Sequence, residues 1–116
     1  MADVTIYHNP RCGTSRKTLD LIRKKGIEPK VVEYLKTPPT EKELDAILKL
    51  LGMDPRELLR TKEEVYKRLK LENPKLSRAA LIAAMVRHPI LIQRPIVLSK
   101  GRAALGRPPE NVEQIL

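Results

Sequence analysis

Short runs of β-branched residues alternate in this chain with longer stretches in which apolar residues recur every three or four positions. Residues 4–7 form such a run, which stops at turn residues and is typical of a strand. A helical pattern follows, with Thr14 or Ser15 as its cap and Gly26 as its stop, and residues 30–35 predict a second strand. Because a helix of this length joins the two strands, we expect a right-handed βαβ unit with parallel strands.

The middle of the chain carries helix signals and no strand pattern. Thr40 with Glu43 and Asp54 with Glu57 are two capping boxes, and each precedes an apolar run at helical spacing. Further helical patterns continue until Pro89. We therefore expect an all-helical insert over residues 40–88.

The last part of the chain returns to a strand pattern. Residues 90–98 have strand-like composition, Lys100-Gly101 predicts a tight hairpin turn before residues 102–105, and residues 110–116 predict a short closing helix entered through a proline. The summed order is βα, β, helical insert, ββα. It predicts a single α/β domain over residues 1–116 with a mixed sheet like that of thioredoxin and glutaredoxin. Its core comprises residues 1–39 and 89–116.

The composition is that of an ordinary globular protein of one domain. The chain has 116 residues, 41% of them hydrophobic and 32% charged, and no apolar run approaches the roughly 20 residues of a transmembrane helix. The first residues carry neither a basic segment nor a long apolar stretch, so we expect no secretory signal, no membrane partner and a cytoplasmic location. The single cysteine, Cys12, fits a reducing compartment and excludes an internal disulfide and a cysteine-rich metal site.

Positive charge exceeds negative charge, with 23 lysines and arginines against 14 aspartates and glutamates and a formal net charge of +9. Such a surplus attracts anions of any kind, from nucleic acid to a phosphate-like oxyanion. The lysines lie beside acidic residues in helical stretches, and the absence of tryptophan and phenylalanine leaves few rings for stacking on bases. We therefore expect solvated helix faces and no nucleic-acid partner.

Cys12 lies where the first predicted strand meets the first turn of a helix. Free backbone N–H groups and the helix dipole favour a thiolate there, Arg11, Arg16 and Lys17 add positive charge, and His8 lies four residues upstream. The same N–H groups can bind a tetrahedral oxyanion. The sequence therefore predicts a nucleophile whose thiol pKa is lowered, next to an anion site.

A single cysteine limits the chemistry that is available. Ser15 stands where a Cys-x-x-Cys oxidoreductase would carry its second sulfur, and Thr18 stands where the loop of the tyrosine phosphatases requires an arginine. Cys12 is therefore expected to act as a monothiol nucleophile. Any two-electron reduction then needs a second sulfur, so a small thiol or a thiol protein is an obligatory partner.

Three arginines lie in predicted turns and not on helix faces. Arg60 stands at a helix end, Arg94 precedes the predicted hairpin, and Arg107 follows it. Guanidinium groups are suited to holding a tetrahedral anion through paired hydrogen bonds. The spacing alone leaves open whether these arginines converge on one anion or lie separately on the surface.

Five separated blocks of the sequence, in order, carry a resemblance to a known family. They are YHNPRCGTSR at 7–16, EYLKTPP at 33–39, LLR at 58–60, HPILIQRPIV at 88–97 and GRP at 106–108. Together they resemble the arsenate reductases of the glutaredoxin-linked class, over nearly the whole chain.

The resemblance implies roles for individual residues. Cys12 would be the nucleophile that attacks arsenate, and Arg60, Arg94 and Arg107 would hold the oxyanion and its arsenic intermediates. His8 and Ser15 would support the thiolate. The bond between Arg94 and Pro95 would be cis, as it is in thioredoxin folds generally.

The resemblance also implies a role in arsenic detoxification and the identity of the outside thiols. Glutathione would be the co-substrate that adds to arsenic, and glutaredoxin would be the partner protein that reduces the adduct and frees arsenite. No cofactor or metal would be bound, and we expect a monomer.

Two other functions stay open at this stage. A general monothiol oxidoreductase, acting on glutathione mixed disulfides, would need the same thiolate but not the three arginines. A transcriptional regulator that binds RNA polymerase is a further possibility on this fold. Such relatives typically sense redox state through a Cys-x-x-Cys pair, which Ser15 breaks.

Overall fold

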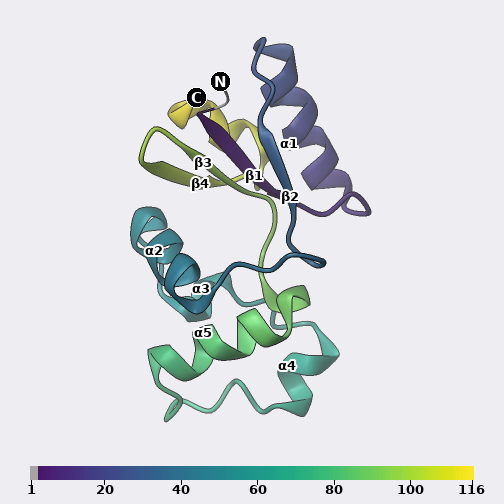
Figure 1. The fold of residues 1–116 in the computed structure, drawn as a ribbon. Helices are drawn as coiled ribbons and strands as arrows, with labels where there is room; N and C mark the ends of the chain where they lie inside the picture. Colours follow the sequence, from purple (N-terminus) through teal and green to yellow (C-terminus); the bar gives the residue numbers. More distant parts are fainter. Residues whose placement is uncertain (1–2) are drawn as a thin grey trace. The chain divides into compact units, whose positions relative to one another are not determined.

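The computed structural model describes residues 3–116, and its elements follow the mixed α/β order predicted from the sequence (Figure 1). The strands are β1 (Val4–His8), β2 (Lys30–Glu33), β3 (Ile96–Ser99) and β4 (Arg102–Leu105). The helices are α1 (Gly13–Lys24), α2 (Glu41–Leu51), α3 (Pro55–Leu58), α4 (Glu64–Arg68) and α5 (Arg78–Arg87), with the 3-10 helices η1 (Pro89–Leu91) and η2 (Pro109–Ile115).

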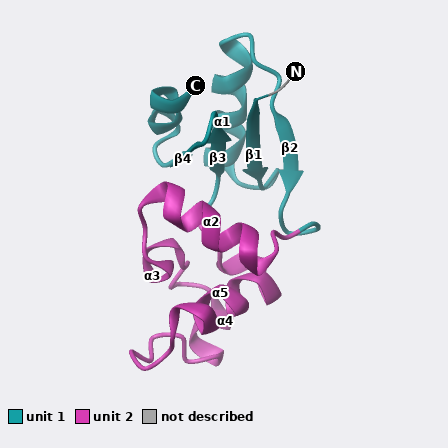
Figure 2. Ribbon diagram, turned by 60° about the vertical axis from the view of Figure 1, so that its left-hand side comes forward, with its two compact units in different colours: residues 1–37, 94–116 teal, residues 38–93 magenta. Residues whose placement is uncertain are grey.

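The chain forms two compact units, coloured separately in Figure 2. The first contains the sheet and comprises the chain up to Thr37 together with Arg94–Leu116, and the second is helical and comprises Pro38–Gln93. The sequence placed these divisions at 39/40 and 88/89. The later second division has a local cause, because the Gln93 N–H donates to the Leu58 carbonyl at 2.9 Å and so holds the segment before β3 within the helical unit.

The sheet of the first unit has the strand order β2-β1-β3-β4. β1 and β2 are parallel, as the βαβ pattern predicted, while β3 is antiparallel to both β1 and β4. Lys100 and Gly101 have φ of 53° and 75°, the left-handed values that a two-residue hairpin turn requires. The predicted α/β class, parallel pair and hairpin are therefore confirmed.

One apolar cluster lies behind the strand that leads to Cys12. Side chains alternate between buried and half-buried along β1, so Val4 and Ile6 point into the core. They pack with residues of α1, β3 and η2, namely Leu19, Ile22, Val97, Val112 and Ile115. This packing fixes the C-terminal end of β1, from which the loop to Cys12 departs.

The helical unit begins its helices where the capping signals predict. Thr40 and Asp54 each form a complete capping box with the glutamate three residues later, Glu43 and Glu57. Gly52 ends α2 in the left-handed conformation, with φ of 66°. The buried faces of α2 and α5 pack together inside this unit.

The structure differs from the sequence prediction between residues 90 and 95, where apolar composition suggested a strand. Residues Pro89–Leu91 form the 3-10 helix η1 instead, in which the Leu91 N–H donates to the His88 carbonyl at 2.9 Å. Pro95 has no N–H for a ladder, so β3 begins only at Ile96. The closing segment is likewise a helix of the 3-10 type, η2.

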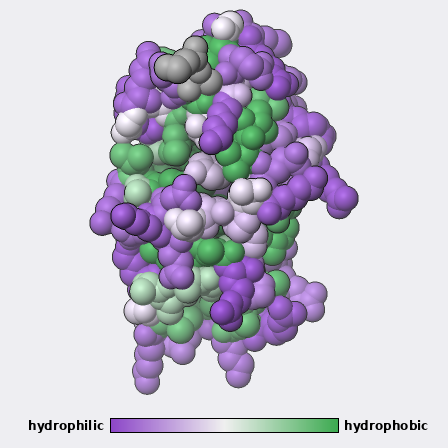
Figure 3. All heavy atoms as spheres, in the orientation of Figure 1, coloured by the Kyte–Doolittle hydropathy of each residue, from purple (hydrophilic) through white to green (hydrophobic). Residues whose placement is uncertain are grey.

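Polar side chains dominate the surface that is visible in Figure 3, with apolar side chains in patches between them. Within residues 3–116, none of the helices has the length and apolar character needed to cross a membrane.

Candidate active site

Cys12 is the N-cap residue of α1. Its backbone is extended, with φ of −93° and ψ of 121°, and its carbonyl accepts the Arg16 N–H at 3.0 Å. The expectation that Thr14 or Ser15 caps this helix is wrong, because both lie inside its first turn. Cys12 is partly buried. The thiol therefore stands at the positive end of the helix, where free N–H groups face it.

Asn9 shapes the loop between β1 and Cys12. Its side-chain oxygen accepts the Arg11 N–H at 2.9 Å, and its backbone carbonyl accepts the Cys12 N–H at 3.0 Å. The Arg16 guanidinium closes the loop from outside by donating to the Pro10 carbonyl at 2.8 Å. Sequence reasoning did not single out Asn9, although an asparagine before proline at a strand end is a known turn signal.

His8 and Ser15 are buried together beneath the loop. His8 Nδ1 lies 2.7 Å from Ser15 Oγ, and the Asn9 N–H donates to the same Oγ at 3.1 Å. Burial lowers the pKa of His8, with a smaller lowering from Arg23 and Arg16 that the Glu33 carboxylate opposes. A neutral imidazole can accept the Ser15 hydroxyl proton at Nδ1. His8 and Ser15 are therefore bonded to each other beneath the Cys12 loop.

The surroundings of Cys12 favour its thiolate. Partial burial raises the pKa of the thiol, but the Ser15 N–H, the Arg94 guanidinium and the Thr14 N–H outweigh burial and lower this pKa below its ordinary value. These groups lower the pKa chiefly because hydrogen bonds to the charged form favour the thiolate, and the positive charge of Arg94 adds to the effect.

Arg94 lies next to the Cys12 sulfur, although the two residues belong to different segments of the first unit. It precedes Pro95 through a cis peptide bond, as the resemblance implied. Its guanidinium donates toward the Cys12 sulfur. Its Nε and Nη1 are buried and have no hydrogen-bond partner among residues 3–116. A buried cationic donor without a partner is energetically costly, so the surroundings of the Arg94 guanidinium are suited to binding an anion.

Arg107 is held next to Arg94 by a hydrogen bond to the Arg94 backbone. Its Nη1 donates to the Arg94 carbonyl at 3.0 Å, and the rest of the side chain is exposed. The turn before it is held by Gly106, whose N–H donates to the Pro95 carbonyl at 2.9 Å. Thr18, fully buried on α1, donates to the Thr14 carbonyl at 2.8 Å and faces the Gly106 carbonyl at 3.4 Å.

Gly106 and Thr18 were not identified as site-forming residues from the sequence. A Cβ on Gly106 would lie 2.6 Å from Thr18 Oγ1 and 2.8 Å from Pro95 Cγ. The glycine is therefore required by the close approach of helix and turn, which no local pattern reveals.

Arg60 belongs to the second unit and is fixed by that unit's own contacts. Its N–H donates to the Leu91 carbonyl at 2.8 Å, and the neighbouring Leu59 pairs with Ile92 in an isolated bridge. Its Nε donates to the Glu63 carboxylate at 3.1 Å. The chain continues from this bridged segment through Gln93 directly into Arg94.

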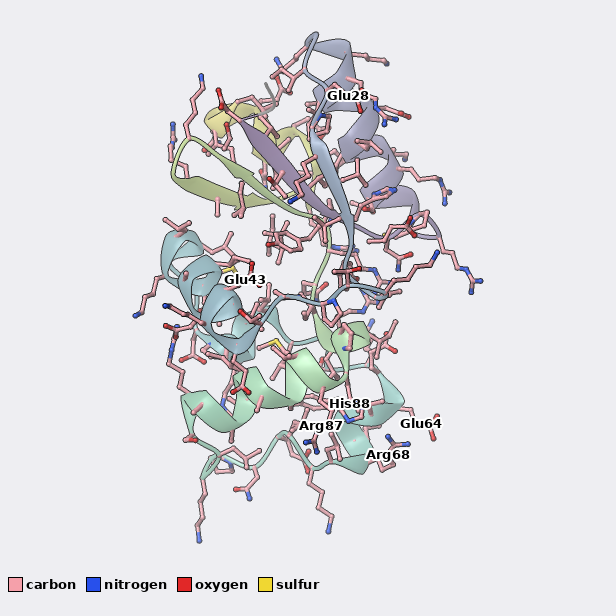
Figure 4. The ribbon with its side chains drawn as sticks, viewed as in Figure 1. Glu28, Glu43, Glu64, Arg68, Arg87 and His88 are labelled. Atoms are coloured by element: carbon pink, nitrogen blue, oxygen red, sulfur yellow. The ribbon has the colours of Figure 1, made fainter. Side chains whose placement is uncertain are left out.

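The helical unit also contains a cavity of about 630 Å³, lined mainly by small residues of α5. Glu41 of α2 and, at the C-terminal end of α5, Arg87 and His88 contribute its polar groups (Figure 4). No cysteine lines this cavity, and residues 3–116 contain no cluster of three or more histidine, cysteine or acidic side chains able to hold a metal. This cavity is therefore not a candidate site for thiol chemistry, and the candidate site is the Cys12 loop.

Replacing Arg94 with alanine is expected to raise the pKa of the Cys12 thiol, because it removes a hydrogen bond and a positive charge from the thiolate while part of the burial remains. The rate of alkylation by iodoacetamide is measured as a function of pH. The midpoint of this profile should shift to higher pH, and alkylation at neutral pH should become several-fold slower. Arg102→Ala removes an exposed arginine and is the control for charge alone. An unchanged profile in Arg94→Ala would contradict this account of the thiolate.

Comparison with known proteins places the chain in a family. Residues 7–115 match the family described as the ArsC family. The chain is 54% identical over 114 residues to an uncharacterized protein of Escherichia coli strain K12 named YfgD, covering 97% of this chain and 96% of that protein. It is 48% identical over 117 residues to a protein of Neisseria meningitidis serogroup A named arsenate reductase, covering 100% of both. A solved structure described as an arsenate reductase from Vibrio cholerae has a TM-score of 0.95 and 51% identity, with 97% of each chain covered.

The four-stranded mixed sheet with its helices is the thioredoxin-like fold. This chain belongs to the ArsC family, which confirms the resemblance to arsenate reductases that the sequence blocks suggested.

Proposed function

We propose that this protein reduces arsenate to arsenite and that Cys12 is the nucleophile. The observation that carries the proposal is the Arg94 guanidinium, which faces the Cys12 sulfur while two of its nitrogens are buried without a partner in the described chain. A thiolate next to unpaired cationic donors suits an oxyanion that a thiol can attack. Full-length relatives named arsenate reductase support arsenate as that oxyanion.

The proposed reaction balances through two thiols besides Cys12. The Cys12 thiolate attacks arsenate, a sulfur–arsenic bond forms, and one oxygen leaves as water after protonation. Glutathione displaces a second oxygen as water. The glutaredoxin thiolate then attacks the glutathione sulfur, a disulfide forms between glutaredoxin and glutathione, and the pair of electrons from the breaking sulfur–arsenic bond reduces arsenic to the trivalent state. Water displaces Cys12 from arsenic, so arsenite leaves and the thiol is regenerated.

The remaining site residues take supporting roles in this proposal. Arg94 and Arg107, joined by the hydrogen bond to the Arg94 carbonyl, hold the oxyanion next to the sulfur. A third guanidinium, that of Arg60, is assigned to the reaction on the resemblance of its sequence block LLR to arsenate reductases. Ser15 supports the thiolate through its backbone N–H while its hydroxyl anchors His8. The chain's only cysteine is Cys12, so the second and third sulfurs come from glutathione and glutaredoxin.

The test is a coupled assay with glutathione, glutaredoxin, glutathione reductase and NADPH. Arsenate should cause NADPH oxidation that depends on this protein, and omission of either thiol should abolish it. Arg60→Ala should abolish arsenate reduction while sparing any exchange with glutathione mixed disulfides. If arsenate gives no oxidation above background while mixed disulfides are reduced, the protein is a general monothiol oxidoreductase and the proposal is wrong.

A further inference from the structure

We propose that Glu63 is a positioning residue that sets the orientation of Arg60 for the oxyanion. The inference rests on the role that the proposed function gives to Arg60. It concerns a carboxylate that none of the sequence patterns marked, placed three residues after the arginine and in direct contact with it.

The contact between the two side chains leaves one edge of the guanidinium available. Arg60 Nε lies 3.1 Å from Glu63 Oε2, and neither Nη nitrogen of Arg60 donates a hydrogen bond within residues 3–116. The two Nη groups form the end of the fork that pairs with oxyanions. Glu63 therefore binds Arg60 at Nε and leaves the two Nη groups of Arg60 available to an anion.

Both partners are held on a fixed frame. The Arg60 N–H is tied to the Leu91 carbonyl at 2.8 Å, and the Glu63 N–H returns to the Arg60 carbonyl at 3.3 Å. The side chains are only 23% and 25% exposed. A pair of this kind restricts rotamers more than an exposed pair does, because solvent competes for it less.

The use of the Glu63 carboxylate differs from that of Glu43 and Glu57, the glutamates at the starts of α2 and α3. Glu63 stands at the N-cap of α4, yet its side chain makes no capping hydrogen bond. In α2 and α3 the glutamates of the capping boxes do bond to free backbone N–H groups. The carboxylate of Glu63 turns back to Arg60 instead, so its role in the structure is toward the arginine.

Two variants separate position from charge. Glu63→Ala removes the acceptor and the charge, so Arg60 gains rotational freedom, and we expect kcat for arsenate to fall about tenfold. Glu63→Gln keeps an acceptor for Nε but removes the negative charge beside the anion, so kcat should recover to within about threefold of the native value while KM for arsenate falls. Glu64→Ala is the matched control, because Glu64 is exposed and points outward from α4 (Figure 4).

A second measurement needs no turnover. Phosphate, as a non-reducible oxyanion, should protect Cys12 from iodoacetamide, and the concentration for half protection should rise several-fold in Glu63→Ala but not in Glu63→Gln or Glu64→Ala. This result would support the positioning role even if arsenate is not reduced.

The inference is overturned if Glu63→Ala matches Glu64→Ala in kcat and in protection while Arg60→Ala loses both. It is also overturned if Glu63→Gln is as impaired as Glu63→Ala, since an acceptor for Nε would then be irrelevant. If Arg60→Ala itself leaves protection and kcat unchanged, the role of Arg60 in the proposed function fails, and the positioning role fails with it.

Discussion

Cys12→Ser is expected to abolish arsenate reduction while leaving the protein as stable as before, or slightly more so. Loss of the thiolate should lower kcat about a thousandfold or more, because a serine hydroxyl is a far weaker nucleophile than a thiolate and the first sulfur–arsenic bond would not form. The variant is therefore a test of chemistry with the fold held constant.

The stability part of this prediction follows from the place of Cys12 at the N-cap of α1. Its backbone angles are those of a capping residue, but its sulfur makes no regular capping hydrogen bond. Serine is among the preferred N-cap residues, and its oxygen can accept from the Ser15 N–H, which contributes up to about 1 kcal/mol. The thermal midpoint should thus stay equal or rise. The coupled assay and thermal unfolding measure the two parts, and residual activity within tenfold of native would refute Cys12 as the nucleophile.

Gly106→Ala is expected to destabilise the protein and to impair arsenate reduction together. The added Cβ would lie 2.6 Å from Thr18 Oγ1 and 2.8 Å from Pro95 Cγ, so the turn must move away from α1. Overpacking of this kind costs about 1–3 kcal/mol, which lowers the thermal midpoint by about 4–15 °C in a domain of this size. Activity should fall because the moving turn carries Arg107.

A second substitution shows whether the clash is the cause. Thr18→Ala removes both of the threonine atoms that the new methyl group would meet. The double variant should therefore lose less free energy of unfolding than the sum of the two single variants. Gly13→Ala, on the helix that carries Thr18, is the control for a glycine without a close neighbour, since its added Cβ has Arg16 Nη2 as nearest neighbour at 3.7 Å. Strict additivity of the two variants would show that the close approach does not limit the turn.

The sequence predicted those elements whose signals are local. The capping boxes that start α2 and α3, the hairpin turn and the βαβ order depend on residues within a few positions of one another. The prediction of a strand from residue 90 onward was wrong because the structure of this segment depends on contacts with distant residues. Its apolar side chains are buried in a 3-10 turn and a bridge to Leu59, and composition alone does not distinguish these from a strand.

The candidate site divides in the same way. Cys12, with its helix terminus and its basic neighbours, could be identified from a single short segment. Asn9, Thr18 and Gly106 could not, because their contributions are a turn geometry and a close approach between segments 88 residues apart.

The sequence by itself determined that the chain has a single cysteine beside a predicted helix N-terminus, and from this we proposed a nucleophile whose further sulfurs come from other molecules. Only the tertiary structure decided which side chains meet that thiol. The Arg94 guanidinium faces the sulfur because β3 pairs with β1, and the turn of Arg107 reaches the Arg94 carbonyl because Gly106 packs on Thr18. The physical reason is that helix and turn signals act over a few residues, whereas convergence depends on strand pairing and packing between distant segments.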